Sequence, residues 1–155
     1  MKLTKHFTLE ELTHSATADS YRITNNPSLQ ELSNLIQLCK KVLEPLREHL
    51  NTPIVITSGY RSPLVNKLVG GVANSQHQKG EAVDIRLPKS SQPGTDGTCH
   101  TDLDRAYQWI NWLVQNVSFD QCILETANQK DYWLHLSYKC APKQNRHQVI
   151  THLQK

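Results

Sequence analysis

The chain has 155 residues, of which 37% are hydrophobic and 20% charged, which suits one ordinary globular domain with its own core. Its formal charge of +3 is mild and the basic residues are scattered, so nucleic acid is not expected as a partner. The mean hydropathy is −0.55, and no apolar run approaches the roughly 18 residues that a membrane-spanning helix needs.

The N-terminal segment, MKLTKHFTLEEL, lacks the apolar stretch of a secretion signal, so we expect no ordinary export of the chain. The cysteines lie far apart, with no CxxC pair and no spacing typical of a metal knuckle. Without an export signal, reduced thiols are favoured over a disulfide framework. The residues concerned are Cys39, Cys99, Cys122 and Cys140.

Helices dominate the first third of the chain. Thr8 is predicted to begin a short helix as its N-cap, with Glu11 as its capping-box partner. A longer helix is predicted for residues 27–50, because a proline stands at its first position and apolar residues recur every three or four positions. Pro45 lies inside this segment, so we expect a kink or break near Glu44.

Short strands and one helix are predicted for the middle of the chain. Residues 53–58, PIVITS, are rich in β-branched side chains and predict a buried strand. Residues 63–70 predict a two-turn helix that begins at a proline and ends at a glycine pair. Residues 81–87, EAVDIRL, alternate as a strand does, and residues 88–100 have the composition of an exposed loop.

The last third of the chain begins with a predicted helix that Thr101 and Asp104 cap. Two strands follow, residues 119–126 and 132–138, and the polar segment between them indicates a hairpin. The helix is expected to bury one apolar face. The residues of that face are Leu103, Ala106, Tyr107, Ile110, Leu113 and Val114.

The polar tail ends in a predicted edge strand, residues 147–153. No internal repeat and no second core are visible, so residues 1–155 are expected to form one domain. Helices come first and strands mostly later. This order predicts an α+β fold with a small, mostly antiparallel sheet flanked by helices.

Two polar segments stand out against these elements. Residues 75–85, SQHQKGEAVDI, place His77 and Asp84 on either side of Gly80, whose turn allows them to meet. His135 lies in an otherwise apolar strand, where taken alone it is better interpreted as a hydrogen-bonded core histidine than as a ligand. Together, two imidazoles and a carboxylate would suit zinc and leave a fourth position for water. The spacing alone is a weak signal.

A family resemblance strengthens this interpretation. The segment SGYRSPLVNKLVGGVANSQHQKGEAVDI and the later WLHLS resemble the zinc D-Ala-D-Ala carboxypeptidase family, to which phage endolysin peptidases, D-Ala-D-Ala dipeptidases and the hedgehog signalling domain are related. The family hallmarks are S-x-H-x-x-G-x-A-x-D and a later W-x-H-x-S. The matching residues are Ser75, His77, Gly80, Ala82 and Asp84, then Trp133, His135 and Ser137. The resemblance extends over nearly the whole chain. It includes the segments FTLEELTHSATADSYRITNNPS, LIQLCKKVLEPLR and FDQCILE.

The resemblance implies the fold of these peptidases and one zinc ion per chain, held by His77, Asp84 and His135. Zinc lowers the pKa of a bound water toward about 7 and polarises the scissile carbonyl. The cleavage also needs a general base and acid. By resemblance to the family's strand glutamate, that residue is Glu125.

The assignment of the base has alternatives. Some relatives carry their glutamate three residues before the metal histidine, where this chain has Tyr132. Glu125 is therefore favoured over Asp131, and a base from elsewhere in the chain stays open. Glu81 lies an odd number of residues from Asp84 on the predicted strand, so it is expected to point to the other face and to be a surface residue.

Two further residues are implied in substrate binding. Arg61 matches an arginine that anchors substrate near the metal, and a guanidinium suits a carboxylate because it donates two parallel hydrogen bonds. The alternative is an arginine that only braces its turn. Ser75 matches the motif serine, whose hydroxyl would bind substrate or a backbone turn.

The expected function is zinc-dependent hydrolysis of bacterial cell-wall peptides near D-alanine. The bond cut, whether by a carboxypeptidase, a dipeptidase or an endopeptidase, is not decided by the sequence. The alternatives are a catalytically silent zinc-binding module of the same fold and an assembly platform of a phage or its host, without zinc. We expect a monomer whose partner is a peptidoglycan peptide. It is expected in the cytoplasm, with a phage holin as a route to the cell wall.

Overall fold

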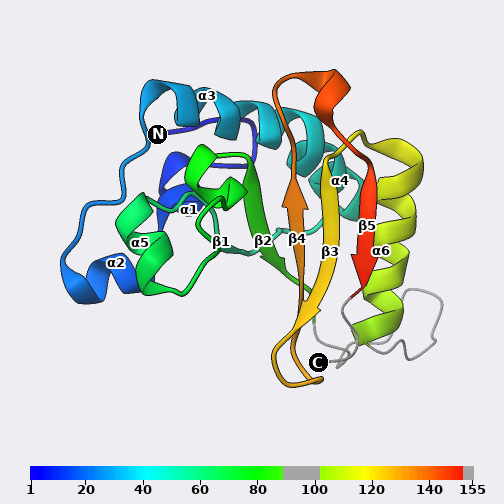
Figure 1. Ribbon diagram of the computed structural model, residues 1–155. Coiled ribbons are helices and arrows are strands. Elements are labelled where there is room, and N and C mark those ends of the chain that lie inside the picture. The colour runs from blue at the N-terminus through cyan, green and yellow to red at the C-terminus, as the bar shows by residue number, and fades with distance from the viewer. Residues whose placement is uncertain (89–101, 152–155) are drawn as a thin grey trace.

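A computed structural model describes residues 1–88 and 102–151, and in it helices pack against a five-stranded mixed sheet (Figure 1). The strand order is β1-β2-β4-β3-β5. This architecture confirms the predicted α+β class. The strands are β1 Ile56–Ser58, β2 Ala82–Arg86, β3 Gln121–Thr126, β4 Tyr132–Ser137 and β5 Gln148–Thr151.

Three of the four strand pairings are antiparallel, and the pairing of β3 with β5 is parallel. The predicted hairpin is present as β3 and β4, and β5 is the edge strand expected in the tail. Residues 152–153 of that prediction lie outside the described part of the chain. The first strand is shorter than residues 53–58 and is not buried as predicted, because only Ile56–Ser58 pairs with β2 and it does so at the edge of the sheet, where Val55 is 46% exposed.

The helices of the described segments occupy mainly the N-terminal half. They are α1 Leu9–Thr13, α2 Ala16–Tyr21, α3 Leu29–Leu38, α4 Glu44–Leu50, α5 Pro63–Leu68 and α6 Asp102–Asn116. A π-helical turn η1 (Cys39–Leu43) joins α3 to α4, and two 3-10 turns are η2 (Gln76–Lys79) and η3 (Pro142–Gln144). The predicted capping box of Thr8 and Glu11 is present at the start of α1.

The long helix begins later than predicted, and the irregularity expected near its proline takes the form of a widened turn. It begins at Leu29, because the Ser28 side chain and Glu31 form a capping box there. Near Pro45 it does not break but widens into η1, in which Glu44 N–H donates to Cys39 O. The wider turn accommodates a proline that has no N–H and whose ring would crowd the preceding turn.

α6 buries a narrower face than the one predicted. Ala106, Ile110 and Leu113 are buried as expected, whereas Tyr107 and Val114 are 37% and 39% exposed. The prediction for these two was wrong because they lie at the margins of the buried stripe of Ala106, Ile110 and Leu113. The predicted cap Thr101 lies outside the described residues.

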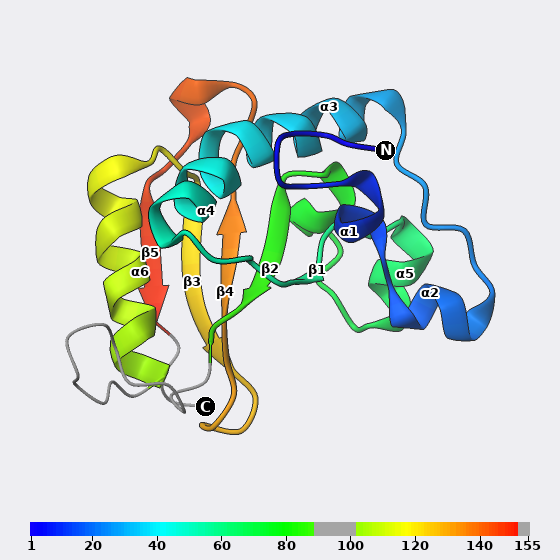
Figure 2. The ribbon, with the colours of Figure 1, turned by 180° about the vertical axis from the view of Figure 1, so that it is seen from behind.

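The core lies between one face of the sheet and the helices. Viewed from behind, α3 and α4 cross that face and α6 runs beside it (Figure 2). The side chains on this face are fully buried; they are Val83, Ile85, Cys122, Leu124, Leu134 and Leu136. The opposite face of β2, β4 and β3 has no helix over it in the view of Figure 1. That face is left to carry polar side chains.

Candidate metal centre

Three neighbouring strands place the predicted site residues on one face of the sheet. Asp84 of β2 is paired with His135 of β4, which is paired in turn with Ile123 of β3. Residues directly opposite each other in antiparallel strands point to the same side. Glu125, two residues after Ile123, therefore shares the face of Asp84 and His135.

His77 reaches this face from η2. Ser75 caps the turn, with its hydroxyl accepting from His77 N–H at 3.3 Å, and Gly80 ends it in the left-handed conformation at φ 68°. A Cβ on Gly80 would lie 2.4 Å from Glu31 O, so the position needs glycine for both conformation and space. The chain then enters β2, which places Asp84 beside His77.

The three side chains bring one ligand atom each to a common point. Asp84 Oδ1 lies 3.4 Å from His77 Nε2 and 3.0 Å from His135 Nδ1. All three atoms lie within 4.8 Å of one another. Tetrahedral zinc with nitrogen and oxygen ligands has ligand-to-ligand distances of about 3.3 Å. The spacing therefore fits a zinc ion with three protein ligands and one open position.

The environment of His77 fixes which nitrogen is offered. Its ring is buried, and Nδ1 lies 2.7 Å from Gly59 O. A carbonyl oxygen only accepts, so Nδ1 donates a proton to it, and Nε2 is the ring nitrogen that faces Asp84 and is left for a metal ion. Such a backbone hydrogen bond on the other ring nitrogen is typical of metal-binding histidines.

Asp84 is held in its charged form. Burial would raise the pKa of this carboxyl, but hydrogen bonds from His135 and then His77 outweigh burial and hold the pKa well below its ordinary value. A metal-binding carboxylate must be ionised, and the histidine nitrogens become ligands once their protons leave. The site is thus suited in charge as well as in geometry to a divalent cation.

Arg61 contacts the other oxygen of Asp84. Its Nη2 donates to Asp84 Oδ2 at 3.2 Å, and its Nε donates to Ser58 Oγ at 2.9 Å. Its backbone N–H donates to His77 O at 3.1 Å. Arg61 therefore braces both the turn and a candidate ligand, a contact that motif matching did not reveal. Its role toward substrate stays a prediction.

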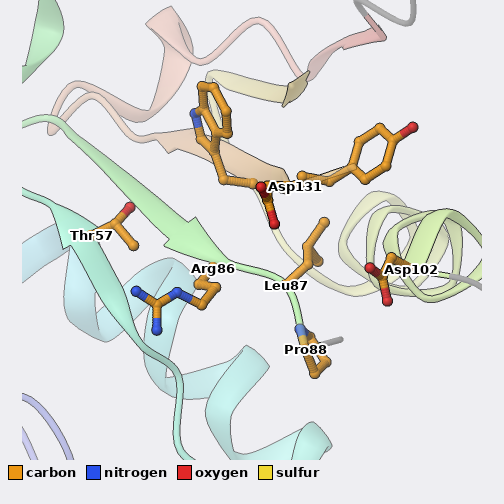
Figure 3. Close-up of a pocket in the computed structure, with 8 residues that line it drawn as sticks. Thr57, Arg86, Leu87, Pro88, Asp102 and Asp131 are labelled. Carbon is orange, nitrogen blue, oxygen red and sulfur yellow. The ribbon is translucent and has the colours of Figure 1, made fainter. Parts of the chain in front are cut away.

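A cavity of about 480 Å³ lies beside the metal centre, and one of the three candidate ligands, His135, lines it together with Glu125 and Ser75. Asp131, the alternative base, instead lines a second hollow of about 610 Å³ together with Arg86, near the turn that joins β3 to β4 (Figure 3). The geometry thus favours Glu125 over Asp131 as the group that shares a space with His135.

Glu81 and the cysteines complete the comparison with the predicted positions. Glu81 is half-buried and lines the cavity of Glu125, contrary to the prediction of a surface residue. It precedes β2, so strand alternation does not set its direction.

Cys39, Cys122 and Cys140 are free, and burial raises the pKa of the Cys39 and Cys122 thiols to about 12, so both stay protonated. Cys99 lies outside the described residues.

A centre of two histidines and one carboxylate with an open position suits a metal-dependent enzyme, and comparison with known proteins identifies the class. A family model described as Peptidase M15 matches residues 5–102, which is more than half of the chain. The chain therefore belongs to the peptidase M15 family, whose members are zinc-dependent. No curated protein matches the chain.

The matched segment includes Arg61, His77 and Asp84 but ends before Glu125 and His135. The pairing of β2, β4 and β3 connects these later residues to the matched segment, because it brings His135 to Asp84 and Glu125 to the same face.

In the described part of the chain, no helix is both long and apolar enough to cross a membrane.

Proposed function

We propose that this protein is a zinc peptidase that hydrolyses bacterial cell-wall peptides next to D-alanine, as a D-Ala-D-Ala carboxypeptidase or an endolysin-like enzyme. Membership of the peptidase M15 family supports the peptidase class. The resemblance of residues 58–85 and of WLHLS to D-Ala-D-Ala carboxypeptidases supports the substrate. The observation that carries the proposal is that Glu125 lines the same cavity as His135 of the three-ligand centre.

Each residue of the site has a defined task in this proposal. His77, Asp84 and His135 would hold zinc, which when bound lowers the pKa of a coordinated water and polarises a carbonyl. Glu125 takes the proton of the attacking water and returns it to the leaving amine. Arg61 holds Asp84 in its orientation and, with Ser75, binds the substrate beside the ligands.

Hydrolysis of defined muropeptides tests the proposal. Purified protein with stoichiometric zinc is expected to release products that mass spectrometry identifies, and the products show which bond is cut. A chelator should stop the reaction and added zinc should restore it. Cleavage that persists in the chelator, or zinc-loaded protein that cleaves no muropeptide, would contradict the proposal.

A further inference from the structure

The wall of the Glu125 cavity is built over a buried carboxylate, Asp120. Its side chain is 0% exposed and lies directly before β3. The backbone fixes its place, because Asp120 N–H donates to Ser137 O at 2.8 Å. A buried charge is stable only with partners, and its partners come from two segments that surround the cavity.

Arg146 is the principal partner of Asp120. Its Nε donates to Oδ1 at 2.9 Å, its Nη2 donates to Oδ2 at 2.8 Å, and its backbone N–H donates to Oδ1 at 3.1 Å. A guanidinium has five N–H bonds, of which this carboxylate accepts two. Within residues 1–88 and 102–151 no other acceptor takes the rest, and the Arg146 side chain is 51% exposed. Arg146 is thus fixed in place with donors to spare.

Lys139 adds a second positive charge to the same carboxylate. Its Nζ lies 4.0 Å from Asp120 Oδ2, and both Lys139 and Arg146 line the cavity of Glu125. One negative charge therefore faces two positive charges at this end of the cavity. Glu81 and Glu125 also line it, but neither forms an ion pair with Arg146 or Lys139 among the described residues.

The same carboxylate connects this wall to the metal centre. Gln76 Nε2 donates to Asp120 Oδ2 at 3.0 Å, and Gln76 is the first residue of η2, which carries His77. A group bound by Arg146 would therefore lie in a cavity whose position relative to the ligands is fixed through Asp120. Such a fixed cation loses little conformational freedom when it binds a ligand.

We propose that Arg146, held by Asp120 and assisted by Lys139, is a specificity-determining residue that binds a carboxylate of the peptide substrate. This inference rests on the proposed function and narrows its substrate class to peptides with a free carboxylate close to the cleaved bond. The carboxylate comes either from the C-terminus of the peptide or from an acidic residue within it. Both offer the planar pair of oxygens that a guanidinium binds.

Binding to a variant that does not turn over separates this inference from the proposed function. In zinc-loaded Glu125→Gln protein, calorimetry would compare a D-alanine-terminated stem peptide with its C-terminal amide and with a form whose internal acidic side chain is amidated. One of the two amides is expected to bind roughly tenfold more weakly than the acid, since a charge-assisted hydrogen bond is lost. The amide that loses affinity identifies the source of the carboxylate.

The Arg146→Lys and Lys139→Met changes, each added to that protein, assign the effect to this wall. Arg146→Lys keeps a positive charge for Asp120 but replaces the planar fork of donors with a single ammonium group, so the preference for the acid should fall. Lys143→Met, at an exposed lysine of η3, is the matched control and should preserve the preference. Equal affinity for acid and amides before any change at Arg146, or a preference that survives Arg146→Lys and Lys139→Met, would overturn the inference. Absence of hydrolysis alone would overturn only the proposed function.

Discussion

At the scale of single residues, Glu125 is the position on which the chemistry depends. We expect Glu125→Gln to keep zinc, because none of the three ligands changes, and to lower kcat by about 100-fold or more, because the amide cannot accept the proton. Zinc content by elemental analysis and kcat on a muropeptide measure the two effects. Asp131→Asn is the matched control and should retain activity, since Asp131 lines the other hollow. Full activity of Glu125→Gln would remove this residue from the mechanism.

Arg61 offers a second prediction, because it holds the Asp84 oxygen that the histidines do not contact. Arg61→Met should weaken zinc affinity roughly 10- to 100-fold, which is typical when a ligand loses its orienting partner. Competition with a zinc-binding dye would measure the affinity. Arg86→Met is the control, since Arg86 is on the same strand and face, two residues beyond Asp84. If both variants bind zinc as the unaltered protein does, the 3.2 Å contact of Arg61 has no role in metal binding.

Much of the metal site could be predicted from sequence at this scale, because ligands and a glycine turn form a local motif. The structure brings His77, Asp84 and His135 together as expected. The contacts of Arg61 with Asp84 and of Arg146 with Asp120 were not predicted. Each joins segments that are far apart in sequence, and neither has a periodic pattern that would reveal it.

At the scale of secondary-structure elements, strand alternation was a better guide than helix periodicity. In β4, Leu134 and Leu136 are buried in the core and His135 between them points to the other face, whereas Ser137 departs from alternation because it is also buried. The width of the buried face of α6 and the start of α3 were mispredicted, because neighbouring elements and one serine cap decided them. The widened turn before Pro45 likewise depends on backbone geometry that residue type alone does not specify.

The turn that ends η2 is where an element depends on a single glycine. Gly80→Ala should destabilise the fold by more than about 1 kcal/mol, because it adds a collision with Glu31 O to the strain of a left-handed backbone. Gly70→Ala is the matched control, with φ +72° but nothing within 4 Å of its Cβ, so it should show the conformational cost alone. Chemical denaturation compares the two free energies of unfolding. Equal losses would show that the contact with Glu31 is relieved at no cost.

Asp120 links β3, η2 and the approach to β5, and it gives stability a pH dependence. Burial would raise the pKa of Asp120, but hydrogen bonds from Arg146 and Gln76 outweigh burial and lower it from 3.8 to about 2. The folded pKa is below the unfolded one, so this contribution is present above about pH 4 and is lost as pH falls toward 2. Asp120→Asn should remove it, and the free energies of unfolding of the two proteins should converge over that range. A constant difference down to pH 2 would contradict the coupling.

At the scale of the whole molecule, the three candidate ligands come from η2, β2 and β4, so a bound zinc ion would join separate parts of the fold. A ligand that binds only the folded state stabilises it by about 2.7 kcal/mol at a free concentration 100 times its Kd. For a chain of 155 residues, each kcal/mol raises Tm by about 2–4 °C. We therefore expect zinc to raise the Tm of chelator-treated protein by roughly 5–10 °C, measured by calorimetry. His135→Ala should abolish the rise while leaving β2 and β4 paired, because their backbone hydrogen bonds do not involve the imidazole. A Tm that zinc leaves unchanged would mean that these three side chains, although correctly spaced, do not bind the ion in the folded protein.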